Sequence, residues 1–120
     1  MKKQLTVIGS GLTGPLVSSI LALKHNCNIA MYERSDDGRK NNTFSGRSIN
    51  LALSNRGINA LKYADIYDSD FESMLIPMYG RTIHTINDEE IFQSYGNKKE
   101  HYINSVSRSE INKILMISSI

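Results

Sequence analysis

The chain has 120 residues, which is enough for one domain with a modest core. Its 14 basic and 12 acidic residues give a formal net charge of +2, too small a field to favour a nucleic acid or an anionic membrane surface as a partner. Hydrophobic residues make up 40% of the chain, as is typical of a folded globular protein rather than a disordered one.

The sequence shows no sign of secretion or membrane insertion. Cys27 is the single cysteine and excludes an internal disulfide, so we expect a reducing, cytoplasmic location. Lys2 and Lys3 precede an apolar stretch, but glycines and polar residues soon interrupt it, unlike in a signal peptide. The apolar runs fall far short of the roughly 20 residues that span a bilayer. We therefore expect no membrane segment in this chain.

The N-terminal quarter has the pattern of a strand, a helix and a second strand. The run 5–8 is apolar and β-branched and ends at a glycine, which predicts a buried parallel strand. Apolar residues recur at helical spacing over 12–24, and a second short apolar run follows at 28–32. Pro15 falls in the first helical turn, where its missing N–H would have no partner. The order predicts a βαβ unit over 4–33.

The stretch VIGSGLTG joins the first strand to the helix and contains the pattern G-x-G-x-x-G. In this pattern Gly9 allows the tight turn, Gly11 lets a diphosphate approach the backbone, and Gly14 lets helix and strand pack closely. Amides at the helix start would attract the diphosphate. Glu33 ends the second strand and is placed to accept hydrogen bonds from a ribose hydroxyl, which argues against a 2′-phosphorylated nucleotide. Spacing, strands, helix and acid together favour a dinucleotide cradle over an ordinary turn with a solvated Glu33.

The middle of the chain is less regular. A loop and a helix are expected over 34–66: the polar stretch 34–47 reads as the loop, and Ser54 as the N-cap of a helix of about ten residues. The stretch 78–95 alternates in polarity and predicts a β-hairpin whose turn contains Asn87 and Asp88.

A strand and a helix are expected over 101–118. Ser107 and Glu110 form an S-x-x-E capping box that starts the helix. The helix has an apolar face that would be left exposed if its partner elements were absent, and we interpret this face as a sign of truncation. Its members are Ile111, Ile114, Leu115 and Ile117.

Several of these stretches together resemble the kynurenine 3-monooxygenase family of FAD-dependent aromatic hydroxylases. The resemblance rests on GSGLTG with YER, on GRSINLALSNRG and on IPMYGRTIH, and it continues through SYG to YINSVSRSEINKIL. The run RSINLALS is its most specific part. The resemblance covers essentially the whole chain but only the N-terminal part of a longer enzyme. It implies a Rossmann-like α/β fold with a small β-hairpin insertion, incomplete relative to the family fold.

The resemblance also implies chemistry. The family uses FAD as cofactor and NADPH and O2 as co-substrates to hydroxylate L-kynurenine to 3-hydroxykynurenine in tryptophan degradation and NAD biosynthesis. Arg81 and Tyr95 in the hairpin would bind the amino-acid carboxylate of L-kynurenine. No residue of this chain is expected to act as a catalytic nucleophile or base. The residues that would contact FAD are Gly9, Gly11, Leu12, Thr13, Gly14, Tyr32, Glu33, Arg34, Arg47, Ala52 and Arg108.

Other interpretations stay open. Tyr79 and Gly80 stand where many relatives have an arginine and a small residue, which removes a positive charge near the implied substrate site. The chain is alternatively a truncated, non-catalytic nucleotide-binding protein or part of another FAD-dependent aromatic hydroxylase; an NAD-dependent dehydrogenase domain is disfavoured by GRSINLALS. No cluster of His, Cys, Asp or Glu has metal-ligand spacing, so no metal is expected, and His84 is expected to be a packing residue. We expect the isolated chain to bind FAD poorly and to be inactive.

Overall fold

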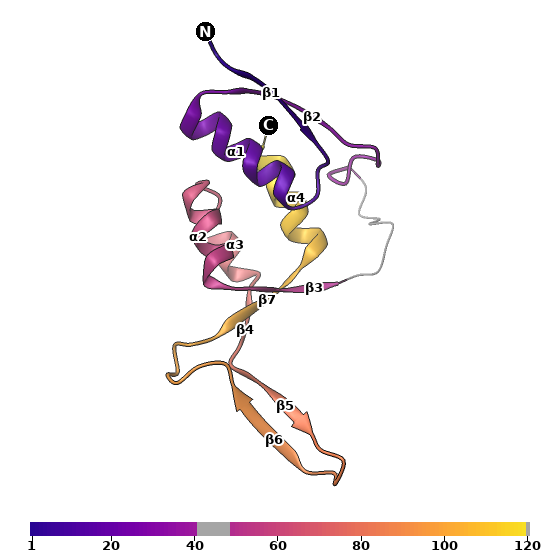
Figure 1. Ribbon diagram of the computed structural model, residues 1–120, viewed down its shortest axis with the longest axis vertical. Helices are drawn as coiled ribbons and strands as arrows, with labels where there is room; N and C mark the ends of the chain where they lie inside the picture. The colour runs from indigo at the N-terminus through magenta and orange to yellow at the C-terminus, as the bar shows by residue number, and fades with distance from the viewer. Residues whose placement is uncertain (41–48, 120) are drawn as a thin grey trace.

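The computed structural model describes residues 1–40 and 49–119 of a mixed α/β chain (Figure 1). Its strands form a parallel pair β1–β2, an antiparallel sheet in the order β3–β7–β4, and a hairpin β5–β6. This arrangement is compatible with part of a Rossmann-like domain. The elements in chain order are β1 (Gln4–Ile8), α1 (Thr13–His25), β2 (Asn28–Tyr32), β3 (Asn50–Leu53), α2 (Asn55–Tyr63), α3 (Ser69–Ser73), β4 (Ile76–Met78), β5 (Gly80–His84), β6 (Glu90–Ser94), β7 (Ile103–Ser107) and α4 (Arg108–Ser118).

The first unit has the predicted order of strand, helix and strand. β1 and β2 pair in parallel from Gln4 opposite Asn28 to Ile8 opposite Tyr32, and α1 connects them. Exposure alternates along both strands, so one face of the pair is half-buried and the other is open to solvent. On the open face Ile8 is 79% and Tyr32 62% exposed. The prediction of a buried strand is therefore wrong for one face, because a short apolar run does not reveal how many faces are covered.

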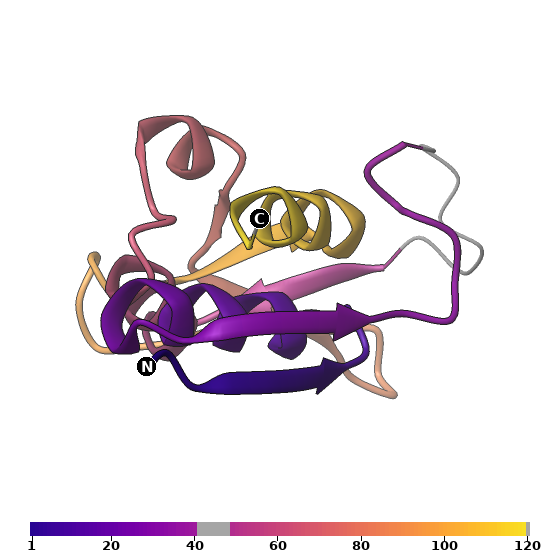
Figure 2. The same ribbon diagram turned by 90° about the horizontal axis from the view of Figure 1, so that it is seen from above.

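The hydrophobic core lies where the helices meet β7. Leu61, Phe71, Val106 and Leu115 are each at most 3% exposed and come from α2, α3, β7 and α4. Apolar side chains of α1 pack against this cluster from the other side. Figure 2, seen from above, shows α1 beside the β1–β2 pair and α4 further from it. The core therefore joins α4, near the C-terminal end of the chain, to α1, near its start.

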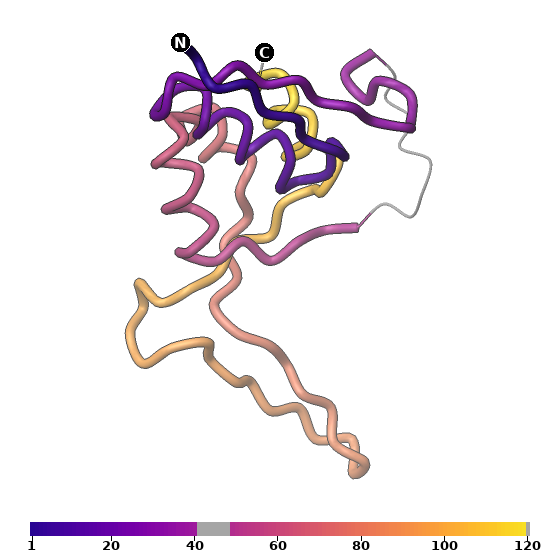
Figure 3. Tube along the Cα trace, turned by 45° about the horizontal axis from the view of Figure 1, so that its top comes forward, coloured from indigo at the N-terminus to yellow at the C-terminus, as the bar shows by residue number. Residues whose placement is uncertain are grey.

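The β5–β6 hairpin projects away from this core (Figure 3). The chain measures 64 × 32 × 23 Å and has a radius of gyration of 17.7 Å. A compact domain of this length would have a radius of about 14 Å. Every residue of β6 is exposed, and Phe92 is 64% exposed. The hairpin was predicted over 78–95, and its turn contains Asp88 at a φ of 60°, as its Asn-Asp sequence suggests.

The helix starts differ from the predicted capping. Ser54 and Ser107 stand at the N-cap positions of α2 and α4, but neither side chain makes a capping hydrogen bond. The predicted capping box is wrong because Ser107 ends β7 and its Oγ lies 2.9 Å from Ser109 Oγ instead. A side-chain cap forms at Asp68, whose Oδ1 accepts a hydrogen bond from Phe71 N at 2.8 Å. This cap starts α3, a helix for which no prediction was made from the sequence.

The apolar face of α4 is largely covered. Ile111 is 5% and Leu115 2% exposed, and Ile114 packs against the same core. Only Ile117 of the predicted face is exposed, at 53%. This face therefore has partner elements within the described chain, because α1 and β7 pack against α4.

Two buried hydroxyls in α1 give a stability prediction. Ser18 and Ser19 are 1% and 2% exposed, and neither Oγ has a hydrogen-bond partner within the described parts of the chain. A buried polar group without a partner destabilises the folded state, and alanine also favours the helix. We expect Ser18→Ala to raise the free energy of unfolding by about 1 to 2 kcal/mol, as measured by urea denaturation.

The control for this prediction is Asn59→Ala at an exposed position inside α2. Asparagine and serine have similar helix propensities, so this change should add only about 0.5 kcal/mol. A loss of stability in Ser18→Ala would show that the hydroxyl has a partner in solution.

Candidate functional site

The glycine loop between β1 and α1 has a separate reason for each of its three glycines. Gly9 has a φ of 95°, which disfavours other residues, and its N–H donates to Tyr32 O at 2.8 Å. A Cβ at Gly14 would overlap the carbonyl oxygen of Gly9, so this position requires glycine for helix–strand packing. A Cβ at Gly11 would have no heavy atom within 4 Å. Gly11 therefore borders open space, and no neighbouring atom explains its missing side chain.

Glu33 holds the glycine loop from the end of β2. Its Oε2 accepts hydrogen bonds from Ser10 N at 2.7 Å and from Ser10 Oγ at 3.1 Å, and its Oε1 accepts one from Ser35 N at 2.9 Å. The backbone hydrogen bond from Ser10, followed by that from Ser35, lowers the pKa of Glu33 from 4.5 to about 2. The carboxylate therefore stays ionised at neutral pH while it orders the loop.

Asn112, which is not among the residues predicted from the sequence, holds the same loop from α4. Its side-chain Nδ2 donates to Ser10 O and to Gly11 O, both at 2.9 Å. The N–H and the C=O of Ser10 are thus both bonded, by two side chains that are far apart in the sequence. The only sequence signal was the position of Asn112 one helical turn after Arg108, a predicted cofactor residue.

Four other predicted FAD contacts lie at the start of α1 or next to Glu33 in the sequence. Leu12 stands at the N-cap position of α1 and packs against the core, and Thr13 is the exposed first residue of that helix. Tyr32 and Arg34 flank Glu33, and both are exposed.

Two further predicted contacts, Ala52 and Arg108, lie on β3 and α4, and a third, Arg47, is not among the described residues. Ala52 is exposed on β3, where it pairs with Ser105 of β7. Arg108 begins α4, is half-buried, and donates its backbone N–H to Ile49 O at 3.0 Å. Arg108 and Asn112 are four residues apart and therefore share one face of α4. Arg47 lies outside the described residues.

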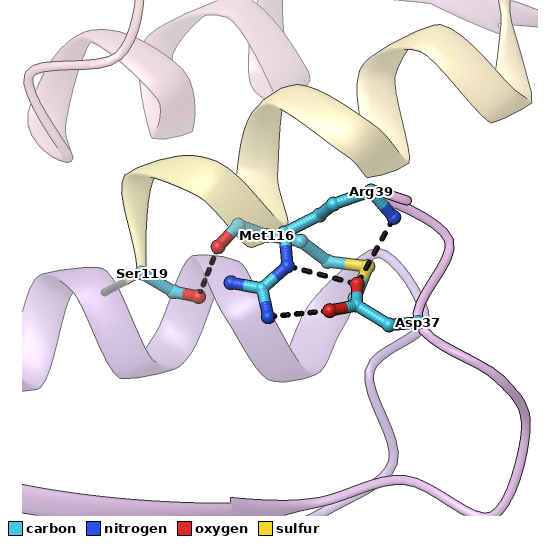
Figure 4. A network of polar contacts seen from close by, with 4 residues as sticks. All are labelled: Asp37, Arg39, Met116 and Ser119. Carbon is cyan, nitrogen blue, oxygen red and sulfur yellow. Dashed lines mark hydrogen bonds and ion pairs between the residues drawn. The ribbon is translucent and has the colours of Figure 1, made fainter. Parts of the chain in front are cut away.

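The loop after β2 contains an ion pair that the sequence did not predict. Arg39 donates from Nε to Asp37 Oδ1 at 2.8 Å and from a terminal nitrogen to Oδ2 at 2.7 Å, while its backbone N–H donates to Oδ1 at 3.0 Å. Figure 4 shows the guanidinium turned towards this carboxylate, and Ser119 bonded to the Met116 carbonyl. The pairing with Arg39 lowers the pKa of Asp37 to about 2. The charge of Arg39 is therefore already balanced by its neighbour.

The structure places the two predicted substrate residues on the hairpin, away from the glycine loop (Figure 1). Arg81 stands opposite Gln93, and its Nε donates to Gln93 Oε1 at 2.7 Å. Tyr95 donates its backbone N–H to Tyr79 O at 2.9 Å, two pairs closer to the base of the hairpin than Arg81 and Gln93. Because side chains alternate along a strand, Arg81 and Tyr95 share one face of the hairpin. His84, near Glu90, belongs to the opposite face.

The fold is mixed α/β and is compatible with a partial Rossmann-like region, and sequence comparison names the relatives. The chain is 41% identical over 120 residues to kynurenine 3-monooxygenase of Cytophaga hutchinsonii. This match covers 99% of this chain and 26% of the relative. It is 46% identical over 110 residues to the Flavobacterium johnsoniae enzyme of the same name, covering 92% of this chain and 24% of the relative. It is 42% identical over 115 residues to the Sus scrofa enzyme of the same name, a match that covers 96% of this chain and 24% of the relative.

The comparisons confirm the resemblance seen in the sequence motifs. The chain spans about a quarter of the length of the curated relatives that it matches. No family model matches it. Within residues 1–40 and 49–119, none of the helices combines the length and the apolar character needed to cross a bilayer.

The hydrogen bonds of Glu33 give a pH prediction. The pKa in the folded chain is about 2 and the ordinary value is 4.5, so the stabilisation is fully present above pH 4.5 and disappears as the pH falls towards 2. We expect the difference in Tm between the wild type and Glu33→Gln to be constant above about pH 5 and to shrink towards pH 2, as followed by circular dichroism.

The matched control is Glu89→Gln, at an exposed position beside the hairpin turn. It removes the same charge without touching the glycine loop, so its Tm should follow the wild type at each pH. A Glu33→Gln difference that does not change between pH 5 and 2 would contradict the role of the carboxylate.

Proposed function

We propose that this chain forms the FAD-binding part of a monooxygenase that hydroxylates L-kynurenine to 3-hydroxykynurenine with NADPH and O2. The observation that carries the proposal is the open space at Gly11, next to the first turn of α1 and to Glu33. The first four N–H groups of a helix have no partner within it, so this turn offers donors to an anion.

The residues present fit the diphosphate of FAD. Gly9 and Gly14 are explained by backbone conformation and by packing, whereas Gly11 needs neither a positive φ nor space next to protein atoms. A missing side chain that faces open space is what close approach of a ligand to the backbone requires. The N–H groups of Gly11, Leu12 and Thr13 would hold the diphosphate.

Charged residues around the loop support the same assignment. Glu33 uses three hydrogen bonds in the folded chain, and its remaining acceptor capacity would serve a ribose hydroxyl of the adenosine half. Arg108 would offset phosphate charge from the start of α4. Tyr32, Arg34, Arg47 and Ala52 would contribute the outer contacts. FAD, when bound, supplies the redox and oxygen-transfer chemistry, while this chain binds and orients it.

The substrate assignment depends on the hairpin. Arg81 would pair with the carboxylate of L-kynurenine, with Tyr95 as a second donor on the same face. The exposure of this hairpin supports the alternative function, a nucleotide-binding chain without turnover. We therefore propose that the isolated 120-residue chain binds FAD weakly and does not hydroxylate.

The FAD assignment predicts that alanine substitutions at Gly11 and Gly14 have different effects, the first on FAD binding and the second on stability. In an NMR titration of the 15N-labelled chain, FAD should shift the amide signals of Gly9, Gly11 and Gly14. Gly11→Ala should weaken binding at least about tenfold, because its methyl would occupy the ligand's space, and should change the free energy of unfolding by less than about 0.5 kcal/mol. Gly14→Ala should instead destabilise the fold by about 2 to 3 kcal/mol, because its methyl overlaps a backbone oxygen. Unaltered FAD binding by Gly11→Ala would refute the cradle.

The substrate assignment is tested in a chimera in which residues 1–120 replace the matching segment of the Cytophaga hutchinsonii enzyme. Arg81→Ala should raise KM for L-kynurenine by an amount equivalent to about 2 kcal/mol or more, with flavin content unchanged. His84→Ala, on the opposite face of the hairpin, is the control and should leave KM unchanged. An Arg81→Ala chimera with the parent KM would exclude the carboxylate role, and an inactive parent chimera with bound flavin would favour the alternative function.

A further inference from the structure

The peptide groups on either side of Gly11 both have their carbonyls turned towards α4. Ser10 O and Gly11 O accept hydrogen bonds from the same nitrogen, Asn112 Nδ2, each at 2.9 Å. In a trans peptide the C=O and the following N–H point in opposite directions. The bond to Ser10 O therefore turns the N–H of Gly11 away from α4, and the bond to Gly11 O does the same for Leu12.

Two successive N–H groups that point to one side form a concave site for an anion. The side of the loop that lacks neighbouring atoms at Gly11 has room for such a ligand. Without Asn112, both peptide planes could rotate, because Gly11 is exposed and no other hydrogen bond to its carbonyl is found in the described chain. One side chain thus sets the direction of two donors.

We infer that Asn112 is a positioning residue for the cofactor: it holds the Gly11 and Leu12 N–H groups towards the diphosphate of FAD without touching FAD itself. This inference rests on the proposed function. It assigns to α4 a role in cofactor affinity through the orientation of the loop, which is separate from its packing in the core. Ile111 and Leu115 on the same helix supply that packing.

The position requires a neutral donor, which suggests Asn112→Asp as the test. Aspartate has the same shape, but its carboxylate would face two carbonyl oxygens and could donate to neither. The two facing carbonyl oxygens would raise the pKa of this carboxyl above the ordinary aspartate value of about 3.9, so protonation as the pH falls towards 5 would restore one donor. Glu33, the titratable group bonded to the same loop, has a pKa of about 2 and stays ionised throughout the range from pH 8 to 5.

The experiment is an NMR titration of the 15N-labelled chain with FAD at pH values from 8 to 5. We expect Asn112→Asp to bind FAD roughly tenfold more weakly than the wild type at pH 8, and to recover part of this loss by pH 5. The wild type should change little over this range. Asn59→Asp, at an exposed position on α2, makes the same charge change and should stay within about twofold of the wild type. Equal affinities of Asn112→Asp and the wild type, or a loss that does not recover at pH 5, would overturn the inference.

A measurement without ligand separates this inference from the proposed function. Backbone 15N relaxation should show lower order parameters at Gly11 and Leu12 in Asn112→Ala and Asn112→Asp than in the wild type, while the core signals of β7 are retained. If the wild type does not respond to FAD, the proposed function fails, and the order parameters alone then decide the role of Asn112. Unchanged order at both amides would reject that role.

Discussion

The arrangement of the candidate site depends on one residue, Ser10, whose backbone is bonded on both sides. Its N–H donates to Glu33 from the end of β2, and its C=O accepts from Asn112 on α4. The first bond requires the parallel pairing of β1 and β2, which brings the end of β2 beside the loop. The second requires α4 to pack on α1, across a sequence separation of 102 residues. The loop therefore takes its conformation only when both ends of the chain are folded together.

The molecule is well packed in its core and open along one face of the β1–β2 pair. The candidate site lies between these two regions. The core of α1, α2, α3, β7 and α4 is well buried, whereas the β1–β2 pair is covered on one face only. Parallel sheets are usually covered on both faces. In α/β folds ligands bind at the carboxyl ends of parallel strands. The glycine loop and Glu33 lie at these ends, supported by the core through α1 and α4 and open to solvent on the other side.

Local features of the site could be predicted from the sequence, and long-range ones could not. The glycine spacing predicted the turn at Gly9 and the close packing at Gly14, because both depend on residues that are near in the sequence. Asn112 was missed because its role depends on how α4 packs, and an asparagine inside a helix pattern carries no local signal. The capping box failed for a similar reason: Ser107 also ends a strand, and its hydroxyl meets Ser109. The pattern of β1 predicted its existence but not its open face.

The two side chains that hold Ser10 differ in charge and in hydrogen-bonding role: Glu33 is a charged acceptor and Asn112 a neutral donor. A hydrogen-bond acceptor is needed at Glu33 and a donor at Asn112, because they face an N–H and two C=O groups respectively. The Glu33 carboxylate satisfies loop donors with both oxygens, which would offset part of its repulsion of the diphosphate in the proposed function. A lysine or an arginine at position 112 could also donate, but its charge would attract phosphate oxygens and compete with the carbonyls for the same hydrogen atoms. The neutral amide avoids this competition, and in the proposed function the positive charge would come from Arg108, one helical turn earlier. The loop can therefore be ordered before the ligand arrives, so less of the binding free energy is lost in ordering it.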